Sequence, residues 1–452
     1  MGDRWRQGQT LTLDIDDLNS TGDGVGRWDG RVVFVADAVP GDRVISRLVR
    51  VKPTYAVGKL MSVETPSPER VRPACIVADK CGGCQCQMLS YAGQLAAKQQ
   101  QVVDALARIG GLTISVDPIL GADQPLHYRN KVTYPLRRSP EGIVQAGYYR
   151  KGSHKIVNLN QCPAQDKRLN PLLAQIKQDI QAQGWSIYNE QAHRGKLRHL
   201  GLRIGRRTGE ILVTLVSTAS ALPNLAAQAQ QWLEQFPAVV GVALNHNPDR
   251  TNAIFGPQTR CIAGAPYLEE EFAGLRFQIR PATFFQINTE QAEQLLQVVL
   301  KLLNLQGQER IVDVYCGIGT LTLPLAQQAQ FCMGIEVQPD AIAQAQANAA
   351  LNGIENVRFQ AGRAKALLPD ALSQADMLVI DPPRKGCSPE VLSAIARQPP
   401  PTLVYVSCNP ATLARDLKQL CATAGYQLRR VQPVDLFPQT AHVECVALLE
   451  II

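Results

Sequence analysis

Hydrophobic and polar positions change their spacing along the chain, and the change separates two kinds of structure. Between residues 9 and 64, short alternating runs are broken by Gly-rich turns such as residues 21–26. Five short runs in this segment predict a small β-barrel, which either binds single-stranded nucleic acid or is a structural appendage. From residue 311 onward, short apolar runs alternate with helical spacing. This pattern predicts strand–helix–strand units around a largely parallel sheet.

These patterns predict an α/β protein of three domains. We expect a barrel over residues 1–65 and a central α+β domain made of residues 70–92 and 125–280. We expect residues 93–124, which include an amphipathic helix, to join residues 281–452 in a Rossmann-like domain with a doubly wound sheet. The last two strands of that sheet should form an antiparallel hairpin.

The apolar run at residues 403–406 predicts a buried strand that ends just before Cys408, and a helix is predicted to start after Pro410. Cys408 then lies at the carboxyl end of a strand, where open α/β sheets bind their ligands. Its thiol is therefore a candidate nucleophile. The other interpretation is a small buried hydrophobic residue, which is what most free cysteines are.

A second strand-to-helix turn carries Gly317 and Gly319, which let the backbone approach a ligand closely. Glu336 ends the next predicted strand, where a carboxylate can accept both ribose hydroxyls of a nucleoside. The third glycine of the dinucleotide-binding motif is missing. The sequence therefore favours a cofactor without a pyrophosphate, such as S-adenosylmethionine, over NAD.

Two acidic residues later in the chain are candidates for the same site. Asp381 follows an apolar strand and starts a rigid loop, although the prolines after it are also typical of an ordinary turn. Glu444 lies in an apolar terminal strand, where a carboxylate is costly to bury without a function or a partner, so it is a candidate base. We interpret His442, two residues earlier, as a structural neighbour rather than a catalyst.

Four of the twelve cysteines crowd into one short segment. Cys75, Cys81 and Cys84 have glycines between them that let the backbone fold around a metal centre. Cys162, which is followed by proline, is the best candidate for a fourth ligand, and Cys86 is its competitor. The residues alone leave open an iron–sulfur cluster, a four-cysteine zinc site and unliganded thiols.

The net charge of +7 arises from one segment, because residues 127–210 hold 16 basic and 5 acidic residues. Tyrosines are interleaved with these cations, which suits base stacking with phosphate contact, although any single tyrosine can instead belong to the core. The excess favours a polyanion-binding surface. The chain has neither a membrane-length apolar run nor a signal-peptide pattern, so we expect a cytoplasmic protein without a membrane partner.

Five motifs, in this order, resemble those of the RNA uracil-5-methyltransferases, and specifically the 23S ribosomal RNA type. They are Phe-Phe-Gln-Ile-Asn at 284–288, Asp-Val-Tyr-Cys-Gly-Ile-Gly-Thr at 313–320, Asp-Pro-Pro-Arg at 381–384, Ser-Cys-Asn-Pro at 407–410 and His-Val-Glu at 442–444. The resemblance runs nearly end to end. It implies a class I S-adenosylmethionine-dependent methyltransferase domain, an N-terminal TRAM domain and a 4Fe–4S cluster.

The resemblance also implies a role for each matching residue. Cys408 would add to carbon 6 of uracil so that carbon 5 accepts a methyl group, and Glu444 would then remove the proton from carbon 5. Phe284 would stack on an RNA base. The cluster ligands would be Cys75, Cys81, Cys84 and Cys162, and the contacts to the cofactor or the base would be Gln286, Tyr315, Thr320, Glu336 and Asp381. The expected protein is a monomer that binds RNA and not DNA, and its product is 5-methyluridine.

The sequence departs from the family at Arg363, where the family usually has Asp or Asn to reach the adenine edge, and no role is carried onto Arg363. The cysteine spacing argues against the transfer-RNA branch, although the same chemistry on the T-loop uridine of tRNA stays open. Two rival functions are an amino-methyltransferase, which would need no thiol, and a non-catalytic RNA-binding or chaperone protein.

Overall fold

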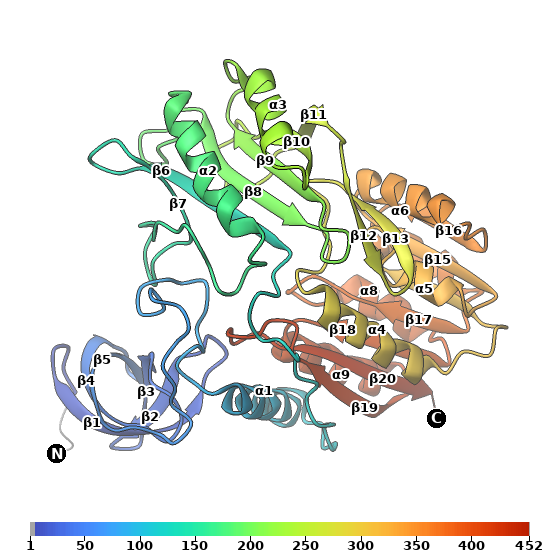
Figure 1. Ribbon diagram of the computed structural model, residues 1–452. Helices are drawn as coiled ribbons and strands as arrows, with labels where there is room; N and C mark the ends of the chain where they lie inside the picture. Colours follow the sequence, from blue (N-terminus) through green and yellow to red (C-terminus); the bar gives the residue numbers. More distant parts are fainter. Residues whose placement is uncertain (1–4, 452) are drawn as a thin grey trace.

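The computed structural model describes residues 5–451; residues 1–4 and 452, at the ends of the first and last predicted domains, lie outside the described residues. The chain forms a barrel, then a mixed sheet, then a larger sheet flanked by helices (Figure 1). In Figure 1 the barrel and the larger sheet lie on opposite sides of the view, with helix α1 (Tyr91–Ala105) between them. None of the helices within this part of the chain is long and apolar enough to cross a membrane.

The N-terminal segment closes into a five-stranded barrel, as its alternating pattern predicts. Along β1 every second residue is buried, and Leu11, Leu13 and Ile15 pack with Val33 and Val35 in a core of their own. The pairing order is β1-β2-β3-β5-β4, and the β3–β5 pair is parallel. The strands are β1 (Thr10–Leu18), β2 (Gly24–Trp28), β3 (Arg31–Ala36), β4 (Arg43–Val51) and β5 (Tyr55–Thr65).

The central part is a six-stranded sheet in the order β11-β10-β9-β8-β6-β7, and two helices share its core. Ile176 of α2 and Trp232 of α3 are fully buried in the same hydrophobic cluster as Leu200 and Val213 of the sheet. The elements are β6 (Lys131–Arg138), β7 (Val144–Ala146), α2 (Leu169–Ala182), β8 (Leu197–Ile204), β9 (Ile211–Ser217), α3 (Leu225–Gln235), β10 (Val239–His246) and β11 (Gln258–Gly264).

The C-terminal part is a seven-stranded sheet in the order β16-β15-β14-β17-β18-β20-β19. Its first five strands are parallel, and the last two form the antiparallel hairpin that the sequence predicts. The strands are β14 (Arg310–Val314), β15 (Phe331–Glu336), β16 (Val357–Ala361), β17 (Met377–Ile380), β18 (Thr402–Ser407), β19 (Tyr426–Val434) and β20 (Glu444–Ile451).

Helices cover both faces of this sheet. Val379 and Val404 point into one hydrophobic cluster, whereas their neighbours Leu378 and Leu403 point into another, as alternating strand residues do when both faces are buried. The helices are α4 (Thr289–Leu303), α5 (Thr322–Ala326), α6 (Pro339–Leu351), α7 (Ala364–Leu372), α8 (Pro389–Arg397) and α9 (Pro410–Thr423). Helix α1 and the π-helical turn η1 (Leu106–Gly110) pack against α9.

Several elements were not named in the sequence-based expectation, among them helices α3, α4 and α7 and the hairpin of β12 (Leu268–Phe272) and β13 (Leu275–Ile279). Helix α7 is short and contains Pro369, which removes a backbone donor and weakens its helical pattern. The hairpin strands contain glutamates beside their apolar residues, and their apolar side chains are buried only because they join the core under α4 and the large sheet.

Candidate active site

Cys408 follows the buried strand β18 and precedes α9, in the strand–turn–helix arrangement that its sequence predicts. Asn409 fixes the turn: its backbone N–H donates to Ser407 Oγ (3.2 Å), and its side chain accepts from the Ala411 N–H (3.1 Å). Pro410 opens the helix at a position where its fixed φ is favourable. The thiol therefore lies at the carboxyl end of the strand and is partly exposed.

Glu444 lies beside Cys408 because β18 and β20 pair antiparallel. Ser407 is opposite Cys445 in this register, so Cys408 and Glu444 occupy the next position along the two strands. Facing residues at such a position have Cα atoms ~5 Å apart. Glu444 is 3% exposed, and its Oε2 has no hydrogen-bond partner among the described residues. An unpartnered buried carboxylate oxygen is costly, so the site is suited to a polar partner supplied by a substrate.

The charged neighbours of Cys408 oppose one another. Burial, together with the carboxylates of Glu444 and Asp381, raises the pKa of Cys408 to about 11, while the Arg384 guanidinium acts in the opposite direction. Burial and Asp381 also hold the pKa of Glu444 well above its usual range, again opposed by Arg384. These shifts place the four side chains in one electrostatic environment. The thiol is therefore protonated near neutral pH in the free protein.

The loop that carries Arg384 is fixed to the turn at Cys408. The carbonyl oxygen of Arg384 accepts hydrogen bonds from Asn409 Nδ2 (3.2 Å) and Thr412 Oγ1 (3.4 Å). At the end of the loop, the Cys387 N–H donates to a carboxylate oxygen of helix α9 (2.8 Å). The loop and the start of α9 therefore form one unit, which holds the Arg384 backbone close to the thiol.

Asp313, at the end of β14, is buried in the site, although no role was predicted for it from the sequence. Its Oδ2 accepts a hydrogen bond from the Thr322 hydroxyl (2.6 Å), and its Oδ1 has no partner in the described part of the chain. Burial raises the pKa of Asp313 to about 7, with a contribution from Glu336. An acid in an otherwise apolar strand is the signal that could have identified it. No role was predicted for Arg384 either. It belongs to the Asp-Pro-Pro-Arg motif at 381–384, which could have identified it as a site residue.

The predicted cofactor contacts lie at the same end of the sheet. Gln286, Thr320 and Asp381 line one small cavity. Tyr315 and Glu336 are not in its lining, but Glu336 is close enough to Tyr315 to contribute to the raised pKa of its hydroxyl, which burial dominates. Tyr315 has φ 71°, in the left-handed region, so the backbone turns sharply after β14. The five residues that come from distant parts of the sequence therefore surround the carboxyl ends of β14, β15 and β17.

His442 lies near this site as a neutral side chain. Burial lowers the pKa of His442 to about 4, and the positive charges of Arg384, Lys98 and Arg129 act in the same direction. Its ring packs edge-on against Phe437, with ring centroids 6.0 Å apart. A neutral, packed imidazole fits the interpretation of His442 as a structural neighbour.

The structure also brings together the cysteines that were predicted to bind a metal. Cys75, Cys81, Cys84 and Cys162 line one enclosed cavity, and Cys86 is not in its lining. Burial and the neighbouring thiols raise the pKa of Cys81 to about 11, although the Gly83 N–H donates to its sulfur. The fourth thiol comes from a segment almost eighty residues away, so the cavity depends on the fold of the central domain.

The four cysteines are not arranged for a single ion. Between residues 5 and 451, no group of three or more His, Cys, Asp or Glu side chains is close enough to hold one metal ion. A structural zinc needs four sulfurs about 2.3 Å from one point, and a 4Fe–4S cluster also uses four cysteine sulfurs, so this arrangement does not distinguish the two centres. The iron–sulfur cluster stays a hypothesis.

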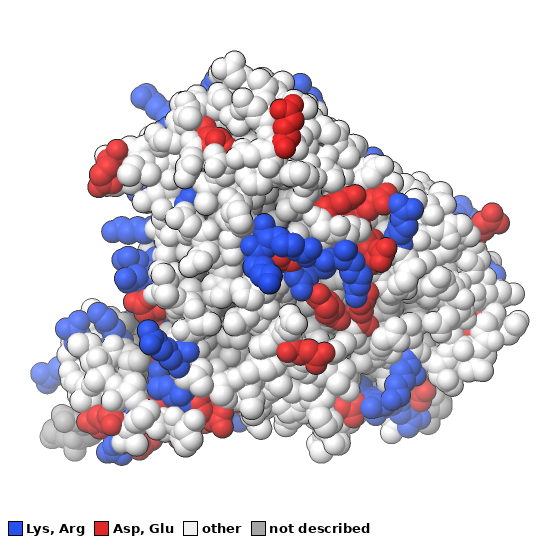
Figure 2. Space-filling model, viewed as in Figure 1, with Lys and Arg blue, Asp and Glu red and all other residues white. Residues whose placement is uncertain are grey.

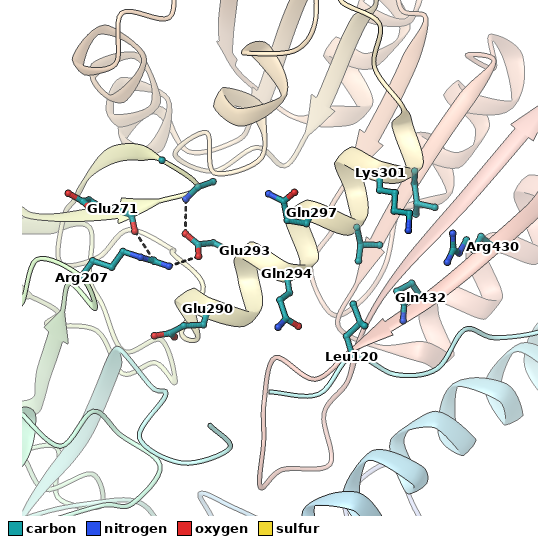
Figure 3. A pocket seen from close by; sticks show the side chains of 14 residues that line it. Leu120, Arg207, Glu271, Glu290, Glu293, Gln294, Gln297, Lys301, Arg430 and Gln432 are labelled. Carbon is teal, nitrogen blue, oxygen red and sulfur yellow. Dashed lines mark hydrogen bonds and ion pairs between the residues drawn. The ribbon is translucent and has the colours of Figure 1, made fainter. Parts of the chain in front are cut away.

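A large hollow lies elsewhere, along helix α4 and the strand β19 (Figure 3). It has a volume of about 880 Å³, and its lining includes Arg207, Glu293, Gln297, Lys301 and Arg430. Figure 3 shows Arg207 directed towards Glu293, with which it forms an ion pair. None of the predicted site residues lines this hollow, so size alone does not identify the chemical site.

Part of the basic excess of the central segment has a structural role. Arg198, Arg203 and Lys177 are buried, and their side chains donate to backbone carbonyls. Figure 2 shows basic and acidic side chains interleaved across the middle of one face. The exposed cations of the segment are Arg137, Arg150, Lys155, Lys167, Arg168, Arg194, Lys196 and Arg207. Phe284, in the loop before α4, is 66% exposed and can stack on a partner.

Comparisons with known proteins agree with this arrangement. Residues 267–452 match the family described as tRNA (Uracil-5-)-methyltransferase, and residues 4–61 match the TRAM domain. The chain is 60% identical over 446 residues to an uncharacterized RNA methyltransferase of Nostoc sp., with 98% of this chain and 97% of that protein covered. It is 42% identical over 445 residues to an uncharacterized RNA methyltransferase of Halalkalibacterium halodurans, with 98% and 97% covered.

Among solved structures, the chain is similar to Pyrococcus abyssi tRNA (uracil-54, C5)-methyltransferase in complex with S-adenosyl-L-homocysteine. The TM-score is 0.77 at 28% identity, and the likeness covers 97% of this chain and 99% of that chain. The predicted α/β methyltransferase fold and the N-terminal TRAM barrel are thereby confirmed. The chain therefore belongs to the RNA (uracil-5-)-methyltransferase family, and it is an S-adenosylmethionine-dependent enzyme that acts on RNA.

Proposed function

We propose that this enzyme methylates carbon 5 of a uridine in 23S ribosomal RNA, through a temporary covalent bond between Cys408 and carbon 6 of the base. The observation that carries the proposal is the pairing of β18 with β20, which puts Cys408 next to Glu444. Addition to a pyrimidine ring followed by elimination needs a nucleophile and a base on the same ring. Methylation of an exocyclic amine would need neither group in this place.

The chemistry starts when the thiol proton of Cys408 passes to solvent. The thiolate electron pair forms a bond to carbon 6 of uracil, and the electrons of the double bond between carbons 5 and 6 move onto the carbonyl oxygen as an enolate. Carbon 5 takes the methyl group from the sulfonium donor, whose sulfur keeps the electron pair of the broken bond. Glu444 removes the proton from carbon 5, the double bond re-forms, and the Cys408 sulfur leaves as a thiolate.

The methyl donor would bind at the carboxyl ends of β14, β15 and β17, where the matching residues gather. Gln286, Thr320 and Asp381 line a small cavity at this end of the sheet, and Glu336 ends the next strand, where it is suited to accept ribose hydroxyls. When bound, S-adenosylmethionine supplies the electrophilic methyl group. Arg384 acts against the raised pKa values of both Cys408 and Glu444, so it favours the ionised forms that the reaction uses.

We further propose that the four cysteines of the enclosed cavity hold a 4Fe–4S cluster. A cation lies next to them, because Arg129 Nη2 donates to the Gly83 carbonyl (3.1 Å) and the nearby Cys84 thiol contributes to the raised pKa of Arg129. A positive charge beside several thiolates offsets their repulsion. When bound, the cluster would cross-link two distant segments of the central domain. The ligands would be Cys75, Cys81, Cys84 and Cys162.

The choice of ribosomal RNA as substrate is supported by the cysteine spacing, because the transfer-RNA branch of the family typically lacks it. The second candidate substrate is a tRNA uridine. It is favoured by the end-to-end likeness to the Pyrococcus abyssi enzyme, whose name specifies tRNA uracil-54. In either case we expect a cytoplasmic monomer.

Two experiments test the proposal. Mass-spectrometric mapping of 5-methyluridine in ribosomal and transfer RNA, from cells with and without this gene, should show a uridine of 23S RNA that loses its methyl group. A loss confined to tRNA would favour the second candidate. In purified protein, Cys408→Ala should abolish methyl transfer, and Glu444→Gln should accumulate a protein–RNA complex that survives denaturation. Full activity of Cys408→Ala would contradict the covalent mechanism.

A further inference from the structure

The segment between β19 and β20, residues 435–443, leads directly into Glu444 and is held by helix α1. Lys98 Nζ donates to Asp435 Oδ1 (2.6 Å) and to the Phe437 carbonyl (3.1 Å). The Tyr91 hydroxyl donates to the other oxygen of Asp435 (2.9 Å). The side chains of Lys98 and Asp435 are 3% and 0% exposed. A buried pair with several hydrogen bonds fixes geometry, because separation would leave an uncompensated charge.

Gln439, in the middle of the 435–443 segment, is clamped by an amide on the same helix. The Gln439 N–H donates to Gln94 Oε1 (2.9 Å), and Gln94 Nε2 donates to Gln439 Oε1 (3.2 Å). Both side chains are buried. Gln439 has φ 70°, a left-handed conformation that a glutamine adopts only when its surroundings impose it.

The cysteine loop, which we define as residues 81–87, binds the same residue from another side. The backbone N–H groups of Gln85 and Cys86 donate to the Gln439 carbonyl, at 3.1 and 3.0 Å. Cys84, the preceding residue, lines the four-cysteine cavity. The barrel also reaches this point, since a methyl group added at Gly22 would lie 2.6 Å from Gln85 Cβ. The backbone carbonyl of Gln439 is therefore held by the cysteine loop, and its backbone N–H and side-chain oxygen are held by Gln94 of α1.

We propose that Gln439 is a positioning residue for Glu444, and that the amide of Gln94 and the order of the cysteine loop together set the position of the base. The inference rests on the proposed function, in which Glu444 removes the proton from carbon 5. Gln439 lies five residues before Glu444, and the hydrogen bonds of its backbone N–H and carbonyl go to α1 and the cysteine loop, with none to the large sheet. Loss of the hydrogen bonds to Gln439 should therefore make the segment that leads into Glu444 more mobile. The sheet and the methyl-donor site should stay intact.

The chain offers a matched control on the same helix. Gln99 Nε2 donates to the carbonyls of Val116 (3.3 Å) and Asp117 (2.9 Å), away from the 435–443 segment. Gln94→Met and Gln99→Met both remove an amide and keep the side-chain volume. Gln94→Met should cost more unfolding free energy, because Gln94 is buried and also donates to the Leu89 carbonyl (2.9 Å), so the two variants are compared at the 435–443 segment and not by stability. Gln439→Gly is the second test variant, because glycine accepts the left-handed backbone and retains the carbonyl acceptor.

Two measurements distinguish positioning from a general structural role. Hydrogen exchange at 438–443, resolved by mass spectrometry, should rise in Gln94→Met and Gln439→Gly and stay unchanged in Gln99→Met. In single-turnover reactions, the two test variants should resolve the covalent protein–RNA complex about tenfold more slowly, because small displacements of a reacting group cost one to two orders of magnitude. Formation of that complex and the Kd for S-adenosylmethionine should stay within about twofold of the original protein.

The inference is overturned if Gln94→Met and Gln99→Met behave alike in exchange and in resolution of the complex. It is also overturned if both test variants slow formation of the complex as much as its resolution. Glu444→Gln serves as the reference: if it accumulates a covalent complex and the test variants do not, the positioning role fails while the proposed function stands. If neither Glu444→Gln nor the unaltered enzyme forms a complex with RNA, the proposed function itself fails.

Discussion

The four-cysteine cavity and the turn at Cys408 both contain buried thiols, but they differ in what surrounds the sulfur. Burial raises the pKa of Cys81 and of Cys408 to about 11 in each case. In the cavity the neighbours are other thiols, contributed by two distant segments, with Arg129 beside them and no carboxylate among the described lining residues. At the turn the neighbours are Glu444, Asp381 and Arg384, and the thiol is partly exposed.

This difference separates a binding thiol from a reacting one. Thiols that converge from several segments can share one centre, and the gain is structural because the centre joins those segments. A single thiol at the end of a strand, with a base and a cation beside it, can form and break a bond with a substrate. The pKa of the isolated sulfur does not distinguish the two regions, whereas the set of neighbours does.

The largest effect should come from removing one sulfur of the cavity. Cys84→Ser should lower the free energy of unfolding by several kcal/mol if the four cysteines hold a common centre. Cys261→Ser, in β11 and outside the cavity, should cost about 1 kcal/mol or less. Thermal unfolding compares the two variants, and absorbance in the blue region of anaerobically purified protein reports the cluster. Equal small losses in the two variants would show that the cavity holds bare thiols. They would contradict the interpretation of these cysteines as ligands of a common centre.

A smaller effect should follow from changing the cation beside Cys408. Arg384 acts to lower the pKa of Cys408, so Arg384→Gln should raise it further and reduce the thiolate fraction at any pH below about 11. Alkylation of Cys408 by iodoacetamide at pH 8, followed by mass spectrometry, should slow roughly three- to tenfold, since Arg384 is exposed and water screens part of its charge.

In the unaltered enzyme the alkylation rate should rise with pH until the thiol is ionised near pH 11. The neighbouring Lys385→Gln serves as the control, because the charges that set the pKa shift of Cys408 are those of Glu444, Asp381 and Arg384. Equal rates in the two variants would contradict the assignment of Arg384.

The smallest effect should come from the surface above the cavity. Arg150 is exposed, its backbone bridges to Cys81, and it lines a hollow between the barrel and the cysteine loop. Arg150→Ala should weaken RNA binding about two- to fivefold and reduce its salt dependence, while the alkylation rate of Cys408 stays unchanged. Filter binding at several salt concentrations measures the effect, and Arg397→Ala, at the end of α8, is the control. An equal loss in both variants would contradict a specific contact.

The sequence predicted the barrel and the large sheet because their apolar spacing is local. The alternation in residues 10–15 and the apolar run before Cys408 both depend on neighbours within a few positions. Helix α7 escaped prediction since it is short and contains a proline. Parts of the basic segment were misread as surface, because only the fold reveals that Arg198 and Arg203 donate to carbonyls inside the molecule.

The candidate site was likewise predicted from the sequence only in part. The motifs predicted that Cys408 and Glu444 belong to one site, and the β18–β20 register places them side by side, although their catalytic roles stay predictions. No role was assigned to Asp313 from the sequence, because its raised pKa arises from burial and from Glu336, which approaches it only in the folded sheet. The hydrogen bonds between Gln94 and Gln439 could not be predicted from the local sequence, because they join residues 345 positions apart.

The long-range pair of Lys98 and Asp435 has a consequence for synthesis of the enzyme. The two residues are 337 positions apart, and the strand that begins with Glu444 follows Asp435 almost directly. During translation, helix α1 leaves the ribosome long before its partners exist, so Lys98 stays in water until nearly the whole chain has been made. A polypeptide released early would carry the barrel and the central sheet but no assembled chemical centre.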